Sequence, residues 1–167
     1  MKNSADLNMV YKPCSQYSEI IDFTKLSTPD KEWELLESIG EGTYGEVFKA
    51  RNLSSGQNAA VKVMESYNEL VEEIEEEYKI LKDLSRHSNL PDFYGIFLKK
   101  IDESEEEADQ IWLVLELCSN GSVTDLVKLL IKKGLKLDES LIRHILRETL
   151  LAIDHLHRNN GNILIKN

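Results

Sequence analysis

A short segment with three glycines at the spacing Gly-x-Gly-x-x-Gly constrains the fold more than any other feature of this chain. It spans residues 39–47 and reads Ile-Gly-Glu-Gly-Thr-Tyr-Gly-Glu-Val. The same spacing opens a helix in dinucleotide-binding folds, so the residues after the third glycine decide between the two structures. Here residues 47–50 have the pattern of a strand, and residues 52–56 have the composition of a turn. The segment is therefore predicted to close a β-hairpin whose small residues let backbone amides approach phosphate oxygens. A glycine-rich hairpin without a ligand is the alternative.

The rest of the pattern predicts five strands with one helix inserted among them, followed by two further helices. Strand candidates cover residues 34–39, 47–50, 59–63, 93–98 and 111–117. Apolar residues at positions 70, 74, 81 and 84 predict a helix between the third and fourth strands, and two more helices are predicted at 123–133 and 139–157. The last helix carries its apolar residues on one face: Ile142, Ile145, Leu146, Ile153 and Leu156. This order predicts an α+β unit followed by an α-rich unit.

Two charged residues, Lys62 and Glu77, stand where the hydrophobic pattern predicts inward-facing side chains. Lys62 lies between Val61 and Val63 in the third strand, and Glu77 interrupts the apolar stripe of the first helix. A carboxylate in an apolar seam is costly unless it is paired, so the two are predicted to form an ion pair. Phosphate oxygens are the other suitable partner for the lysine. The alternatives are an exposed edge lysine and a glutamate that only flanks the stripe.

The composition predicts a soluble intracellular protein with enough apolar residues for a core, since 41% of its 167 residues are hydrophobic. No apolar run is long enough to span a membrane, the start has no signal-peptide pattern, and two cysteines make no disulfide framework. The net charge of −10 comes from two segments, residues 65–77 with seven acids and residues 102–109 with six. No basic stripe stands out, so nucleic-acid binding is disfavoured.

The chain resembles the protein kinase family in the residue types and the order of the glycine segment, Lys62 and Glu77. Residues 112–118, Trp-Leu-Val-Leu-Glu-Leu-Cys, are similar to the last strand of the small lobe and the hinge, and residues 121–126 to the start of the large lobe. Within the family, residues 73–81, residues 92–95 and the hinge segment are similar to those of germinal-centre-type serine/threonine kinases, and most similar to those of the kinase domain of class III myosins. Residues 1–32 show no sustained period and are predicted to be an N-terminal extension, partly ordered by Ile20, Ile21 and Phe23, with a turn at residues 28–30. The resemblance implies a small lobe with a five-stranded antiparallel sheet and one helix (33–117), followed by an incomplete α-helical large lobe (118–167).

The resemblance also implies a role for each matching residue. The three motif glycines would cover the phosphates of ATP, Lys62 would hold the α- and β-phosphates while pairing with Glu77, and Asn162 would contact Mg²⁺. Leu115 would be the gatekeeper, and Glu116 and Cys118 would offer backbone groups to the adenine. The implied nucleotide-binding residues are Ile39, Gly40, Glu41, Gly42, Thr43, Tyr44, Gly45, Val47, Ala60, Lys62, Leu115, Glu116 and Cys118. A metal or redox role for Cys118 is disfavoured because a single buried thiol is usually inert, and His155 and His157 are expected to point apart on their helix.

The catalytic loop departs from the family's pattern. The family has His-Arg-Asp-x-x-x-x-Asn after the long helix, whereas residues 154–165 read Asp-His-Leu-His-Arg-Asn-Asn-Gly-Asn-Ile-Leu-Ile. Aligning residues 157–159 with the start of that motif would put Leu164 at the metal asparagine, so we align Asn162 there instead. A stretch carrying the catalytic Asp is then missing. No Asp or Glu follows Asp154, and no Asp-Phe-Gly segment is present.

These features predict a truncated domain whose lineage function is phosphoryl transfer from ATP to protein serine or threonine, but which is itself unable to catalyse it. The alternative from another class is a non-catalytic, pseudokinase-like module that binds nucleotide or a partner. A third prediction is poor folding, because the apolar face of residues 139–157 would be left uncovered. The expected partners are ATP with Mg²⁺ and an unidentified protein. The expected location is the cytoplasm, with the actin cytoskeleton only if a longer myosin product exists.

Overall fold

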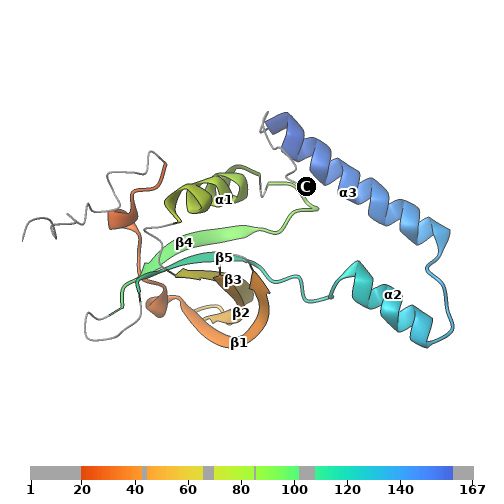
Figure 1. Cartoon of the computed structure of the whole chain (residues 1–167), viewed down its shortest axis with the longest axis horizontal. Coiled ribbons are helices and arrows are strands. Elements are labelled where there is room, and N and C mark those ends of the chain that lie inside the picture. The colour runs from red at the N-terminus through yellow and green to blue at the C-terminus, as the bar shows by residue number, and fades with distance from the viewer. Residues whose placement is uncertain (1–19, 43–44, 66–69, 85, 102–107, 160–167) are drawn as a thin grey trace, which may run out of the picture.

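The first part of the chain forms a five-stranded antiparallel sheet in the computed structural model, which describes residues 20–42, 45–65, 70–84, 86–101 and 108–159. The strands are β1 (Trp33–Gly42), β2 (Gly45–Asn52), β3 (Asn58–Glu65), β4 (Phe93–Lys99) and β5 (Gln110–Glu116). They lie in the order β1-β2-β3-β5-β4, and all neighbours are antiparallel. Helix α1 (Val71–Leu84) lies along one face of this sheet (Figure 1). The predicted strands and the inserted helix are confirmed.

The sheet carries a hydrophobic core on each face, as the alternation of side chains along a strand requires. On the α1 face, Leu113 and Met64 pack with Ile74 of the helix. On the opposite face, Val61 and Trp112 belong to a second core that has no helix in it. Strands β3 and β5 are therefore buried on both faces, which explains their nearly continuous apolar sequence.

The sheet curls so that its two edge strands approach one another over the second core. Trp33 of β1 and Tyr94 of β4 stack with ring centroids 6.0 Å apart and an angle of 10° between the planes. Strand β1 contains two register shifts, between Leu35 and Glu37 and between Ser38 and Gly40. Such irregularities increase the local twist of a strand. The curl thus covers a face that would otherwise need another layer.

The turn predicted after β2 is present, and a polar side chain holds it. The Asn52 carboxamide oxygen accepts hydrogen bonds from the backbone N–H groups of Ser54 and Ser55, at 3.1 and 2.9 Å. Two short 3-10 helices, η2 (Phe23–Lys25) and η3 (Pro29–Lys31), precede β1. The prediction of a turn at residues 28–30 therefore corresponds to the start of η3.

Two helices follow the sheet: α2 (Val123–Lys132) leads away from it, and α3 (Glu139–Asn159) runs back so that its C-terminal end lies near α1 (Figure 1). Helix α2 starts with a capping box, in which Ser122 accepts from the Asp125 N–H and Asp125 accepts from the Ser122 N–H. It ends before Gly134, whose φ of 68° suits a helix C-terminus. The capping residues thus set both ends of α2.

Much of the apolar face of helix α3 is exposed to solvent. Ile142 and Leu146 are exposed, whereas Ile145, Ile153 and Leu156 are half-buried, and Ala152 is the buried residue of the helix. The face predicted from the sequence exists, but only part of it is covered. No helix in the described part of the chain is long and apolar enough to cross a membrane. The domain boundaries at 32/33 and 117/118 stay predictions.

Candidate functional site

The glycine segment forms the tip of the β1–β2 hairpin, where Gly42 pairs with Gly45. The third glycine is required by close packing: a Cβ added to Gly45 would lie 2.0 Å from the Val63 carbonyl oxygen. The hairpin tip therefore lies directly against β3 at a distance that a side chain would prevent. Thr43 and Tyr44, which were assigned to the nucleotide loop, lie outside the described residues.

Lys62 and Glu77 form the ion pair that their positions predict. The Lys62 Nζ donates to Glu77 Oε2 at 2.5 Å, and the two side chains are 20% and 32% exposed. Lys62 comes from β3, between two other strands, and Glu77 comes from α1, three residues beyond the fully buried Ile74. A charge-assisted hydrogen bond with partial shielding from water fixes both side chains. A lysine ammonium has three donors, so this geometry leaves donors for a second anion.

Four of the other residues assigned to the nucleotide, Gly40, Val47, Ala60 and Leu115, lie on the same face of the sheet as Lys62. Gly40 pairs with Val47, and Val47 pairs with Lys62, so the three form one row across β1, β2 and β3. In the next row Ala60 pairs with Leu115 of β5. Residues paired across antiparallel strands share a face. The structure thus places this group of residues together with Lys62 on the face that α1 covers.

The segment after β5 is anchored at Glu116. Its backbone N–H donates to the Asp92 carbonyl at 2.8 Å, and its carboxylate accepts from the Asp92 N–H at 3.2 Å. Burial, with Glu116 and Asp92 nearby, raises the pKa of Tyr94 above its ordinary value. The expectation of a buried thiol at Cys118 is wrong: Cys118 is exposed, because it lies beyond the end of β5, where no described element covers it.

A cavity of about 540 Å³ opens beside the hairpin tip but on the other face of the sheet. Phe48 and Val63 line it together with backbone of Gly42 and Gly45. Val63 follows Lys62 in β3, so the two side chains point to opposite faces. The cavity is therefore lined mainly from the face opposite the ion pair, and Leu70, which packs against the α1-side core, also borders it.

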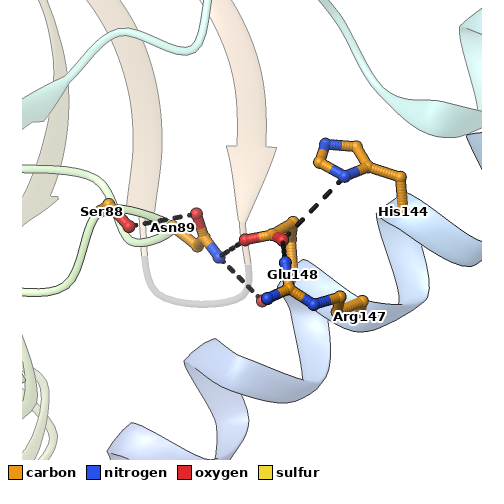
Figure 2. A network of polar contacts seen from close by, with 5 residues as sticks. All are labelled: Ser88, Asn89, His144, Arg147 and Glu148. Carbon is orange, nitrogen blue, oxygen red and sulfur yellow. Dashed lines mark hydrogen bonds and ion pairs between the residues drawn. The ribbon is translucent and has the colours of Figure 1, made fainter.

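A polar junction, missed in the sequence, joins the segment after α1 to helix α3 (Figure 2). The Asn89 side-chain amide donates to the Glu148 carbonyl at 3.0 Å and to its carboxylate at 2.8 Å. Arg147 and His144 flank the same carboxylate. The hydrogen bond from Asn89, with these two neighbours, lowers the pKa of Glu148. Glu148 is an acid at helical spacing from Ile145 and Ala152, so the reasoning that singled out Glu77 could have found it.

The described residues offer no metal site. They contain no group of three or more His, Cys, Asp or Glu side chains that could hold an ion. The His155 ring lies 5.0 Å from the His87 ring, and His157 is exposed. Asn162, the residue assigned to Mg²⁺, lies outside the described residues. The arrangement can therefore hold an anion through Lys62, whereas the described residues bring together no cluster of Mg²⁺ ligands.

Comparison with known proteins agrees with this geometry. The protein kinase domain is the family whose sequence model matches the chain, over residues 33–165. Myosin-IIIa of Homo sapiens is 51% identical over 139 residues, which is 83% of this chain and 8% of that protein. Misshapen-like kinase 1 of Rattus norvegicus is 44% identical, covering 86% of the chain and 10% of the relative. Serine/threonine-protein kinase mig-15 of Caenorhabditis elegans is 43% identical, covering 83% and 12%. The chain thus spans about a tenth of the length of these relatives.

Proposed function

Because the chain belongs to the protein kinase family, and within it is similar to class III myosin and germinal-centre-type kinases, we propose that its sheet unit binds ATP. The observation that supports ATP binding most directly is the Lys62–Glu77 ion pair, which lies beside the glycine hairpin. In this proposal the free donors of Lys62 hold the α- and β-phosphates, and the hairpin backbone covers them. Val47, Ala60 and Leu115 contact the adenine.

By lineage the nucleotide would serve phosphoryl transfer to protein serine or threonine, but we propose that this chain does not catalyse that step. Transfer requires one carboxylate that orients the hydroxyl group and others that hold Mg²⁺. Residues 155–165, within the region matched to the family, contain no Asp or Glu. Asn162 alone supplies neither charge nor a base. A nucleotide-binding module without phosphoryl transfer is the function that the residues support best.

The binding proposal is tested by thermal unfolding of the 167-residue chain with and without ATP and Mg²⁺. At a ligand concentration of 100 Kd, binding stabilises the folded state by about 2.7 kcal/mol, and the midpoint rises accordingly. We expect that rise in the parent chain and its loss in Lys62→Ala. Lys49→Ala is the matched control, because Lys49 also pairs with a glutamate, Glu37 at 3.1 Å, but lies on β2. An equal rise in the parent and in Lys62→Ala would contradict the proposed site.

The inactivity proposal has its own assay, the incorporation of labelled phosphate from ATP into a general protein substrate. No incorporation above background is expected from the parent chain. Incorporation that is abolished by Lys62→Ala would show that this chain transfers phosphate and would overturn the proposal. Incorporation that persists in Lys62→Ala would identify a contaminating kinase instead.

The likeness to class III myosins supports one further proposal about the setting. If a longer product joins this unit to a myosin motor, the protein would act in the cytoplasm at actin filaments. Sequencing of full-length transcripts tests this directly, since a motor-coding region in the same reading frame is required.

A further inference from the structure

Residues 20–32, which we call the N-terminal strap, contribute to the core that α1 shares with the sheet. Ile21 and Phe23 are 4% and 2% exposed. They belong to the same cluster as Val71 and Ile74 of α1 and Leu113 of β5. The strap therefore runs over the surface with most of its residues exposed, but it inserts Ile21 and Phe23 into the core shared by α1 and the sheet.

Hydrogen bonds fix the strap at three places. The Asp22 side chain accepts from the Thr24 N–H and caps η2, which carries Phe23. The Ile20 N–H donates to the Glu75 carboxylate of α1 at 3.3 Å. The Leu98 N–H of the edge strand β4 donates to the Ser27 carbonyl at 3.1 Å. The strap is thus connected to the helix at one end and to the sheet edge at the other.

This segment precedes the region that matches the protein kinase domain, which begins at Trp33. Its buried residues consequently belong to a core whose remaining members lie inside the matched region. Ile74, which packs in that core, stands one helical turn before Glu77. A change in the packing against Ile74 would move Glu77, because α-helical residues three apart share a face.

We propose that the N-terminal strap is a positioning element for α1, and that Phe23 is a positioning residue that holds Glu77 against Lys62. Phe23 belongs to the core in which residues of α1, β4 and β5 meet, so a rotation or shift of α1 would disturb the packing of this core. A test that measures nucleotide affinity rests on the proposed ATP site. A test that measures the mobility of α1 is independent of that site.

The first test is hydrogen exchange of the 167-residue chain, comparing the parent with Phe23→Leu. Leucine keeps an apolar side chain in the core and so preserves folding, but it leaves part of the space of the ring empty. We expect faster exchange within residues 71–84 and unchanged exchange in β3 and β5. Lys31→Ala is the control, because Lys31 lies in the same strap, in η3, and is exposed. Its exchange should match that of the parent.

The second test asks whether Phe23 acts through Glu77. Phe23→Leu should weaken ATP binding roughly 2- to 30-fold, as coupled positions commonly do, and adenosine binding should change little because it lacks the phosphates. In the Glu77→Gln background, Phe23→Leu should cause no further loss, since residues that act together are not additive.

Equal acceleration of exchange in α1, β3 and β5 would identify Phe23 as a general core residue and would overturn the proposal. Unchanged exchange in α1 would overturn it too, as would an affinity loss of the same size in the Glu77→Gln background. If the parent chain binds no ATP, the proposed nucleotide site fails, yet the exchange experiment still decides whether the strap positions α1.

Discussion

Helices α1 and α3 have similar amphipathic sequences but very different surroundings. In α1 the apolar stripe is covered, with Val71 at 8% and Ile74 at 0% exposure, by the sheet and the N-terminal strap. In α3 the apolar residues Leu146 and Leu150 are 57% and 62% exposed. The spacing of apolar residues thus specifies which face of a helix is apolar, but the partner that covers this face must come from elsewhere in the fold.

The same contrast holds for the two units to which these helices belong. Ala152 is the single buried hydrophobic residue among the described residues after β5, whereas both cores of the sheet unit lie within residues 21–114. The sheet unit is therefore expected to carry nearly all of the stability, together with the Lys62–Glu77 pair. The unit of α2 and α3 is expected to be attached through the Asn89–Glu148 junction more than through a core.

The largest expected effect on stability comes from comparing the same substitution, leucine to alanine, in the sheet unit and in the unit of α2 and α3. Leu113→Ala, in the centre of the sheet, should destabilise the protein by about 2–5 kcal/mol, because it removes a fully buried side chain and leaves a cavity. Leu150→Ala on the exposed face of α3 should change the free energy of unfolding by only about 0.5 kcal/mol. Both are measured by urea unfolding followed by tryptophan emission.

Tryptophan emission reports on the sheet unit alone, since the chain has two tryptophans, Trp33 in β1 and Trp112 in β5. Similar losses of stability from Leu113→Ala and Leu150→Ala would break the comparison. They would mean that α3 is part of one cooperative core with the sheet.

The next effect tests how closely the hairpin tip packs inside the stable unit. Gly45→Ala should destabilise by about 1–3 kcal/mol, because the added Cβ would overlap the Val63 carbonyl and force the strands apart. Gly40→Ala is the matched control from the same motif, where the added Cβ would lie 3.9 Å from the Val47 Cβ, an ordinary contact. The urea midpoints of the two variants give the difference. Equal midpoints would show that the tip moves away from β3 without cost.

Features that depend on local periodicity could be predicted from the sequence. The five strands follow from alternating and continuous apolar runs, and the Lys62–Glu77 pair follows from charges at inward positions. The hairpin follows from the strand pattern after the third glycine. In each case the residues that decide the structure lie within a few positions of one another or repeat with a fixed period.

Features that depend on distant contacts could not be predicted in this way. The sequence favours partial order at Phe23, but the core that buries it is formed by α1 and β5 across about 50 to 90 residues of sequence, and its own segment has no period. Cys118 is exposed because no described element covers the end of β5, which composition does not reveal. The Asn89–Glu148 contact joins residues 59 apart in sequence, and only Glu148 had a local signal.

The smallest effect concerns the junction between the two units and its dependence on pH. The hydrogen bond from Asn89, with Arg147 and His144 nearby, lowers the pKa of Glu148 below the ordinary carboxyl value of 4.5. The junction should therefore contribute its full stability above about pH 4.5 and lose it as the pH falls through the lower folded value. Glu148→Gln should lower the midpoint of thermal unfolding at pH 7, followed by far-UV circular dichroism, to which the 21-residue α3 contributes more than the other described helices. The difference from the parent should shrink toward pH 3.

A double-mutant cycle decides whether this pH dependence belongs to the contact with Asn89. In an Asn89→Ala background, Glu148→Gln should have a smaller effect at pH 7, because the two residues act through one contact. Glu139→Gln, at the exposed start of the same helix, should have the same effect in both backgrounds. If Glu148→Gln is equally costly with and without Asn89, the junction does not hold α3. The two units would then be joined mainly by the contact of His87 with His155 and by the chain itself.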